Sequence, residues 1–354
     1  MRAVFVKSFS SLFTLMLITP SVLARSLHSS QNKGDCRSLK MRHNAGNHAK
    51  KCYPGYPRKQ ASYLPYRICY RRFFVGMKPP EGLRRSNSHN PNIRYICQRP
   101  EEKRKSQYGT MFDESLGLAV FSAYTLTAKD VDFQNRAHPA SWAKTPGIEN
   151  QGSDAIYPSL PYIRGQLVPA LTLSNTGKGD EGWLSTFTYT NAVPQRPDFN
   201  MGEWFEFENK IRSYARDDCI PNRGKLYLLT GTSFVHSEPD WPIWPRDPKR
   251  QPWLANIKDN YLIPDSPPIA IPVSLWTAGC CIDSKNGTVT GNFAVIGNNE
   301  EDNQLMHTRQ ISVEQLQSIL KQDVKANENS NRVKLFPAIR DCSKESKQIT
   351  LPWA

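Results

Sequence analysis

The sequence predicts a disulfide-linked α+β protein, and three observations support this fold class. Short apolar runs of the kind that form strands occur at 117–126, 184–190, 225–230, 270–276 and 292–296. Two other segments repeat apolar residues at three- and four-residue spacing, as amphipathic helices do. The chain has eight cysteines and starts with an apparent export signal, a combination that favours disulfides.

Residues 1–24 are predicted to be a signal peptide. Arg2 and Lys7 supply the positive start, residues 12–18 are apolar, and Ala24 ends a small-residue cleavage site. The apolar run is too short to span a bilayer, and no later run approaches the required length. We therefore expect a secreted, extracellular protein without a membrane span.

Residues 25–66 are predicted to form a basic N-terminal extension without a periodic apolar pattern. Residues 31–110 carry 19 Lys and Arg against 4 Asp and Glu, whereas residues 111–354 carry 24 against 28. This concentration of positive charge favours phosphate or sulfate polyanions. A solvated basic tail is the alternative interpretation.

The cysteines predict at least one disulfide between the central part of the chain and an extension. Five of them lie within residues 67–300 and three lie outside this span, so complete pairing requires one bridge across its boundary. Adjacent Cys280 and Cys281 are expected to have different partners, because neighbouring residues rarely reach unstrained disulfide geometry. A zinc site is poorly supported, since neither a Cys-x-x-Cys pair nor His-x-x-x-His accompanies them.

The first helix is predicted after Asn200, with Glu203 completing a capping pair and an apolar face formed by Trp204, Phe207, Ile211 and Tyr214. The second helix is predicted in the C-terminal segment 301–354. Ser312 and Gln315 form a capping box there, before an apolar face formed by Val313, Leu316, Ile319, Leu320 and Val324. A polar tail follows this helix.

A proline-rich segment at 236–268 interrupts the strand-like runs and contains Trp241, Trp244 and Trp253 near basic residues. Aromatic side chains among cations could clamp single-stranded nucleic acid. We favour the alternative of a rigid surface loop whose tryptophans pack on their own core. Separately, Asn286-Gly287-Thr288 is a potential acceptor for an N-linked glycan.

Several motifs in the span 67–300 resemble those of the DNA/RNA non-specific endonucleases of the His-Me finger (ββα-metal) superfamily. The motifs are Tyr162-Ile163-Arg164-Gly165-Gln166-Leu167-Val168-Pro169, Thr190-Asn191-Ala192-Val193-Pro194-Gln195, Asn200-Met201-Gly202-Glu203-Trp204 and the trailing Glu208. Other segments resemble the secreted branch called endonuclease domain-containing 1 protein. These are Phe73-Phe74, Ile96-Cys97-Gln98, Ser122-Ala123-Tyr124, Thr230-Gly231 and Trp276-Thr277-Ala278.

The resemblance implies a His-Me finger nuclease-like fold, with a central antiparallel sheet flanked by helices. It also implies the order strand, strand, helix: a strand ending near Gln166, a returning strand to Asn191, and the helix after Asn200. In an active relative, the motif histidine accepts a proton from the attacking water and one Mg²⁺ neutralises the phosphate. By the same resemblance, Asn200 matches the metal ligand and Glu208 the acid that orders metal-bound water. Asn191 matches a polar partner near the site, and Arg164 the motif arginine.

This chain departs from the motif at its acid and at its base. Ile163 replaces the acid and Gln166 replaces the catalytic histidine. A glutamine amide cannot accept a proton near neutral pH, and loss of a general base typically costs ~10²–10⁴-fold in rate. Helix capping by Asn200 and a solvated or ion-paired Glu208 are adequate alternative roles without a metal. His138, His236 and His307 do not occupy a motif position.

The sequence therefore predicts a secreted, catalytically inactive endonuclease-like protein. It would bind nucleic acid or another polyanion, or serve as a component of the extracellular matrix. The alternative is a Mg²⁺-dependent DNA/RNA endonuclease with an unusual or externally supplied base.

Overall fold

The computed structural model describes residues 72–83, 92–100, 105–133, 141–157, 162–174, 180–237, 257–258, 261–262, 269–300, 307–323 and 332–352. All of them belong to the unit Pro57–Ala354. The predicted signal peptide, residues 25–66, and Trp241, Trp244 and Trp253 of the predicted loop lie outside the described residues. Within the described part of the chain, no helix has the length and apolar character needed to cross a membrane.

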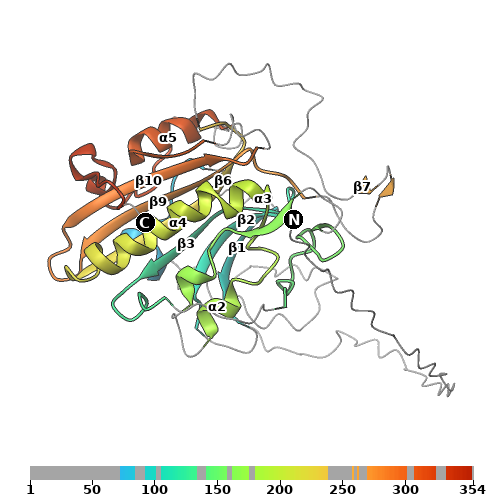
Figure 1. The fold of residues 1–354 in the computed structure, drawn as a ribbon, viewed down its shortest axis with the longest axis horizontal. Helices are drawn as coiled ribbons and strands as arrows, with labels where there is room; N and C mark the ends of the chain where they lie inside the picture. Colours follow the sequence, from blue (N-terminus) through green and yellow to red (C-terminus); the bar gives the residue numbers. More distant parts are fainter. Residues whose placement is uncertain are drawn as a thin grey trace, which may run out of the picture. The chain divides into compact units, whose positions relative to one another are not determined.

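A seven-stranded antiparallel sheet organises the fold, with the strand order β1-β2-β3-β6-β9-β10-β11 (Figure 1). Its strands are β1 (Ile93–Gln98), β2 (Tyr108–Asp113), β3 (Leu118–Leu126), β6 (Gly224–Ser233), β9 (Ser274–Asp283), β10 (Val289–Asn298) and β11 (Thr308–Ile311). The predicted strands at 117–126, 225–230 and 292–296 correspond to β3, β6 and β10. The strand predicted at 270–276 begins only at Ser274.

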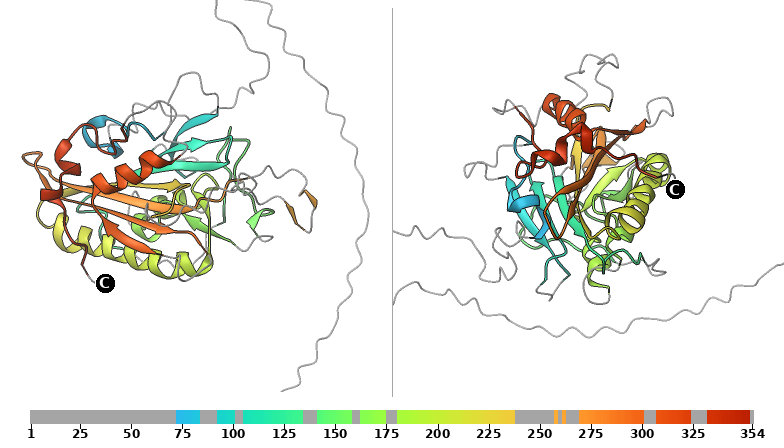
Figure 2. Two further views of the ribbon diagram at one scale, coloured as in Figure 1. Left: turned by 90° about the horizontal axis from the view of Figure 1, so that it is seen from above. Right: turned by 90° about the vertical axis from the view of Figure 1, so that its left-hand side faces the viewer.

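The helices cover both faces of this sheet, as Figure 2 shows from two directions. On one face lies α4 (Glu203–Tyr214), preceded by α3 (Pro197–Met201); on the other face lies α5 (Val313–Gln322). Each face of the sheet has its own hydrophobic core, and alternating residues of β10 contribute to the two cores. Ala294 and Ile296 pack with α5, whereas Phe293 and Val295 pack with α4. The predicted α+β fold with a central antiparallel sheet is confirmed.

The remaining elements are short. Two further strand pairs are β4 (Ile163–Gln166) with β5 (Ala192–Gln195), and β7 (Ile257–Lys258) with β8 (Tyr261–Leu262). The short helices are η1 (Val75–Met77), η3 (Leu171–Leu173), α2 (Glu181–Ser185), the π-helical η4 (Ala215–Cys219), η5 (Arg340–Ser343) and η6 (Glu345–Lys347).

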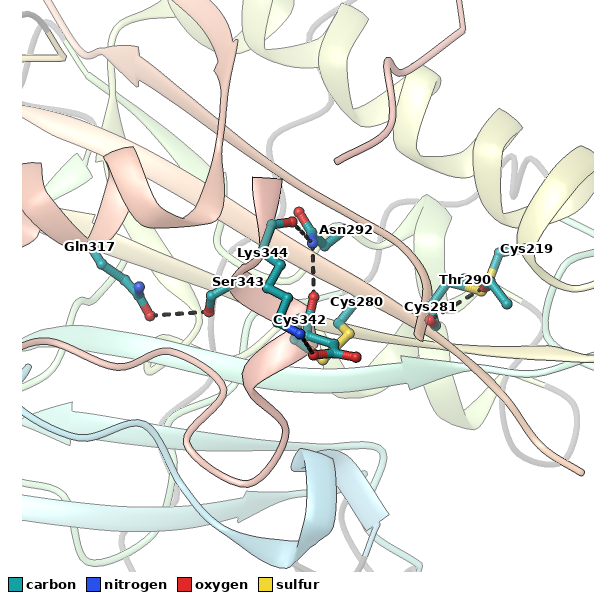
Figure 3. The surroundings of a disulfide bond; sticks show 10 residues. Cys219, Cys280, Cys281, Thr290, Asn292, Gln317, Cys342, Ser343 and Lys344 are labelled. Atoms are coloured by element: carbon teal, nitrogen blue, oxygen red, sulfur yellow. Dashed lines mark hydrogen bonds and ion pairs between the residues drawn. A yellow bond between two sulfur atoms is a disulfide. The ribbon is translucent and has the colours of Figure 1, made fainter. Parts of the chain in front are cut away.

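Strand alternation sends the adjacent cysteines of β9 to opposite faces. Cys281 bonds Cys219 at the end of η4, and Cys280 bonds Cys342 in η5, with Cα–Cα distances of 5.9 and 5.4 Å. Figure 3 shows that Asn292 of β10 also holds η5, because its amide donates to the carbonyls of Asp341 (3.1 Å) and Lys344 (2.9 Å). The expected separate partners of Cys280 and Cys281 are confirmed, as is a bridge across residue 300.

Two local predictions are wrong. Residues 184–190 do not form a strand: Leu184 belongs to α2, and the returning strand β5 begins after Asn191. Asn200 does not cap α4, because Pro197 begins α3 one turn earlier and Gly202 is the N-cap residue of α4. Glu203 does not complete a capping pair; its carboxylate accepts a hydrogen bond from the backbone N–H of Thr308 at 2.7 Å. The predicted capping box of Ser312 and Gln315 is present at α5.

Candidate functional site

The candidate site is built on the β4–β5 hairpin and on α4, which together have the strand, strand, helix order that the resemblance implies. In the hairpin register, Gln166 lies opposite Ala192 and Ile163 lies opposite Gln195. Residues 167 and 168, just after β4, are completely buried, which fixes the end of the strand against the core. The side chain of Gln166 is therefore presented from a rigid position.

Gln166 occupies the histidine position of the motif, and its amide is hydrogen-bonded at both ends. Its Nε2 donates to the hydroxyl and the carbonyl of Thr186, at 3.1 and 3.3 Å. Its Oε1 accepts the backbone N–H of Ala170 at 3.0 Å. Gln166 thus joins the segment after α2 to the start of η3, which is a structural use of the side chain.

Asn191 is completely buried, and its side-chain amide also forms hydrogen bonds with backbone groups. Its Oδ1 accepts the N–H of Val168 at 2.9 Å, and its Nδ2 donates to the carbonyls of Val168 (3.0 Å) and Thr186 (2.9 Å). The amides of Asn191 and Gln166 therefore meet at one carbonyl oxygen. This arrangement stabilises the hairpin.

Arg164 points toward an acidic and aromatic cluster. Its guanidinium forms an ion pair with Asp154 at 2.6 Å and lies 5.5 Å from the centre of the Trp142 ring. The hydroxyl of Tyr189 donates to the same carboxylate. The Arg164 side chain keeps 35% of its surface exposed, so it can still contact an anionic ligand.

Glu208 faces inward from α4 beside a buried arginine. Its side chain is 18% exposed, and its Oε2 lies 3.9 Å from Nη1 of Arg212, whose side chain is 5% exposed. Desolvation raises the pKa of Glu208 to about 7, although the charge of Arg212 and a hydrogen bond from Trp204 oppose this shift. A carboxyl group that titrates near neutral pH is thus present in the site.

The helix η3 connects these groups. Ala170, which precedes η3, donates its N–H to Gln166, and Thr172 within η3 accepts a hydrogen bond from Arg212 at 3.4 Å. The Gln166 side chain and the Glu208–Arg212 pair therefore flank the same short helix. The fold brings together residues that the sequence separates by about forty positions.

Asn200, the position that matches the metal ligand, lies in α3 and is partly exposed. Its amide oxygen and the Glu208 carboxylate are the oxygen donors that Mg²⁺ prefers, and Mg²⁺ usually keeps several waters instead of filling its shell with protein ligands. These residues therefore fit Mg²⁺ in chemical type. Groups of three or more His, Cys, Asp or Glu side chains suited to a metal are absent among the described residues.

Gln195 is a residue of this site to which sequence reasoning assigned no role. It is 1% exposed, and neither its Oε1 nor its Nε2 has a hydrogen-bond partner. Its side chain lies across Gly165, where an added Cβ would meet the Gln195 amide carbon at 2.2 Å. Directly opposite stands Ile163, which replaces the motif acid and offers no acceptor. The motif around Gln195 together with the strand register was the signal that could have identified it.

The histidines considered from the sequence lie elsewhere or outside the described residues. His236 is 3.9 Å from the carboxylate of Glu300, and the backbone carbonyl of His307 accepts a hydrogen bond from Ser237 at 3.4 Å. Both belong to the region where β6 and β10 end and β11 begins. His138 is not among the described residues.

A match to a family model agrees with the motifs. Residues 88–332 match the family model of the DNA/RNA non-specific endonucleases. A nuclease from Nostoc sp. (strain PCC 7120) is 24% identical over 243 residues, which are 64% of this chain and 74% of the Nostoc protein. A chain in the crystal structure of the EndoG/EndoGI complex shares 15% identity, covers 68% of this chain and 87% of its own length, and aligns with a TM-score of 0.41.

Proposed function

The chain belongs to the DNA/RNA non-specific endonuclease family, and from this premise we propose that it binds nucleic acid or another polyanion without cleaving it. The observation that carries the proposal is the state of Gln166. Its amide stands at the base position and is hydrogen-bonded at both ends to Thr186 and Ala170. An amide has no group that accepts a proton near neutral pH, so the water that would attack phosphorus lacks its base.

The loss extends beyond the base. Ile163 supplies no carboxylate, and the amide opposite it, that of Gln195, is left buried without a partner. Buried polar groups of this kind are uncommon in native proteins and need a specific cause. Loss of an acidic partner at position 163 is such a cause, and it supports a site that has stopped performing hydrolysis.

The residues that remain suit binding. Arg164 is partly exposed and can contact a phosphate. Asn200 would hold Mg²⁺ and Glu208 would order metal-bound water; the ion would supply positive charge against a phosphate. Neither residue replaces the missing base in this proposal.

We place this function outside the cell. The disulfides Cys219–Cys281 and Cys280–Cys342 fit an oxidising compartment, and residues 1–24 carry the features of a signal peptide. Asn286 is exposed at the turn between β9 and β10, where its Oδ1 accepts from the Thr288 hydroxyl at 2.7 Å, so a glycan could be carried there. Retention in the extracellular matrix through anionic polysaccharides is compatible with the basic segment 31–110.

A second candidate function is Mg²⁺-dependent cleavage of DNA or RNA. The observation that favours it is that Asn200 and Glu208, whose oxygen atoms suit Mg²⁺, are both retained, with Glu208 facing inward beside Arg212. In this alternative, a group other than the motif histidine accepts the proton from the attacking water.

A nuclease assay separates the two functions. Purified full-length protein with plasmid DNA or RNA and Mg²⁺ is expected to bind without cleaving, and an Asn200→Ala variant is the matched control. Cleavage that requires Mg²⁺ and disappears in Asn200→Ala would overturn the proposal. The double substitution Ile163→Asp with Gln166→His tests the cause, because imidazole titrates near neutral pH. Cleavage gained by that variant and lost on chelation would identify the two departures as the reason for inactivity.

A further inference from the structure

Three aromatic side chains form a continuous surface beside Gln166. Phe187 lies in the middle, with its ring centre 5.5 Å from that of Trp142 and 4.8 Å from that of Trp183. All three side chains keep part of their surface exposed, and Leu184 next to Trp183 is 44% exposed. We call Trp142, Trp183 and Phe187 the aromatic platform.

The backbone holds the aromatic platform in a fixed position relative to Gln166. The N–H of Ala143 donates to the carbonyl of Phe187, and the N–H of Tyr189 donates to Ala143, both at 2.9 Å. Thr186, which accepts two hydrogen bonds from Gln166, donates its N–H to the carbonyl of Trp183 at 3.1 Å. Trp183 and Phe187 therefore lie on the segment that contacts Gln166, and Trp142 is tied to that segment through the backbone of Ala143.

The buried aromatic core of this region is formed by other side chains. Tyr157 and Tyr189, which are 5% and 3% exposed, form the buried aromatic part of the same region together with Ile156 and Ile269. Trp142 packs on this cluster from outside, and Trp183 and Phe187 extend the aromatic surface away from it. The aromatic platform is thus a partly exposed apolar surface next to Gln166.

A cation lies at one end of the aromatic platform. The Arg164 guanidinium is 5.5 Å from the Trp142 ring centre, and the Arg164 side chain is 35% exposed while it pairs with Asp154. A phosphate next to a base stacked on Trp142 would therefore meet positive charge.

We propose that the aromatic platform stacks on unpaired bases, so that this protein prefers single-stranded over double-stranded nucleic acid. Base faces are available to protein rings only when the strand is unpaired, and stacking of this kind tolerates any base. Arg164 binds the phosphate that flanks the stacked bases. This inference rests on the proposed function and adds the form of the ligand and its place on the molecule.

The test compares binding of labelled oligonucleotides of one sequence, single-stranded and double-stranded, by full-length protein at one fixed salt concentration with chelator present. The variant Trp183→Ala is expected to weaken single-strand binding about tenfold and to leave duplex binding unchanged. Trp183→Phe keeps a ring and should restore most of the affinity. Leu184→Ala, at the exposed neighbouring residue, is the matched control and should change neither affinity. Equal thermal midpoints establish that the variants are folded.

The outcomes separate this inference from the function on which it rests. Binding to neither form of nucleic acid by the wild-type protein would overturn both proposals. Wild-type binding that Trp183→Ala weakens equally for both forms, or leaves unchanged for both, would overturn the role of the aromatic platform alone. A selective loss of single-strand affinity that Trp183→Phe repairs would support it.

Discussion

At the scale of single residues, the side chain at position 163 determines whether the buried amide of Gln195 has a hydrogen-bond acceptor opposite it. Ile163 and Gln195 face each other across the β4–β5 ladder, where directly opposed side chains are in contact range. An acid at position 163 could accept a hydrogen bond from the Gln195 amide, whereas isoleucine cannot. The amide is left buried without a partner.

We predict that Gln195→Met stabilises the protein by about 1 kcal/mol, because it removes an unpaired buried amide and keeps an unbranched side chain of similar shape. Denaturant unfolding measures the change. Ile163→Asp should cost less unfolding free energy when residue 195 is Gln than when it is Met. The expected difference in a double-mutant cycle is about 1–2 kcal/mol. A zero coupling energy would disprove the pairing.

Glu208 gives a second prediction at this scale, on the pH dependence of stability. Its pKa is raised in the folded state to about 7 from an ordinary value of 4.5, so the folded state binds more protons between these values. Stability due to this group is therefore complete below pH 4.5 and is lost as the pH rises through 7. The loss amounts to at most about 3 kcal/mol.

The variant Glu208→Gln should remove this dependence and should be more stable than the wild-type protein at pH 8, but not at pH 4.5. Unfolding by denaturant across this pH range provides the measurement. Glu206→Gln, at an exposed position of the same helix, is the control and should leave the wild-type pH profile unchanged. A Glu208→Gln profile that parallels that of the wild-type protein would contradict the raised pKa.

At the scale of elements, α5 shows how a local signal and tertiary contacts reinforce each other. Ser312 accepts the N–H of Gln315 at 3.0 Å, while the Gln315 side chain accepts the N–H of Ser312 at 2.9 Å. The apolar face of the helix then packs on β10, and Leu316 is completely buried. The capping box fixes where the helix begins, and burial of the apolar face stabilises it.

We predict that Ser312→Ala costs about 1 kcal/mol of unfolding free energy, because an N-terminal N–H of the helix loses its acceptor. Ser318→Ala is the matched control on the exposed side of α5, where the hydroxyl only returns to the carbonyl of Glu314. Its effect should stay within about 0.5 kcal/mol. Equal costs for the two variants would remove the capping box from the explanation of this helix.

At the scale of the whole molecule, the positive charge is concentrated at one end of the sequence. Residues 25–66 contain 9 Lys and Arg against 1 Asp, whereas residues 111–354 carry a slight excess of acid. Each phosphate contact releases counterions, so charge-driven affinity falls as salt rises. The basic extension is therefore expected to dominate the affinity for polyanions, while the aromatic platform selects among them.

Deletion of residues 25–66 should lower the affinity for heparin and DNA and should flatten the dependence of log affinity on log salt. Binding measured at several salt concentrations gives both quantities. The deletion should leave the ratio of single-strand to duplex affinity unchanged, because that ratio is assigned to the aromatic platform. A salt slope equal to that of the full-length protein would exclude the extension as the main polyanion contact.

The sequence by itself determined what depends on local order along the chain. The spacing of Trp204, Ile211 and Tyr214 identifies α4. The resemblance to the endonuclease motif implies that Ile163 and Gln166 stand where the motif has its acid and its base. The adjacency of Cys280 and Cys281 already predicts different partners, and the structure confirms this. These inferences hold because each depends on residue types and short spacings.

Tertiary structure alone decided which distant groups meet. The run at 184–190 has strand-like composition, yet packing made Leu184 part of α2, with the Tyr108 hydroxyl donating to the carbonyl of Ser185 at 2.8 Å. Three features join segments that are far apart in sequence. They are the hydrogen bonds at both ends of the Gln166 amide, the desolvation of Glu208 beside Arg212, and the aromatic platform. Burial and hydrogen bonding between such segments leave no signature in either one alone, so only the folded chain reveals them.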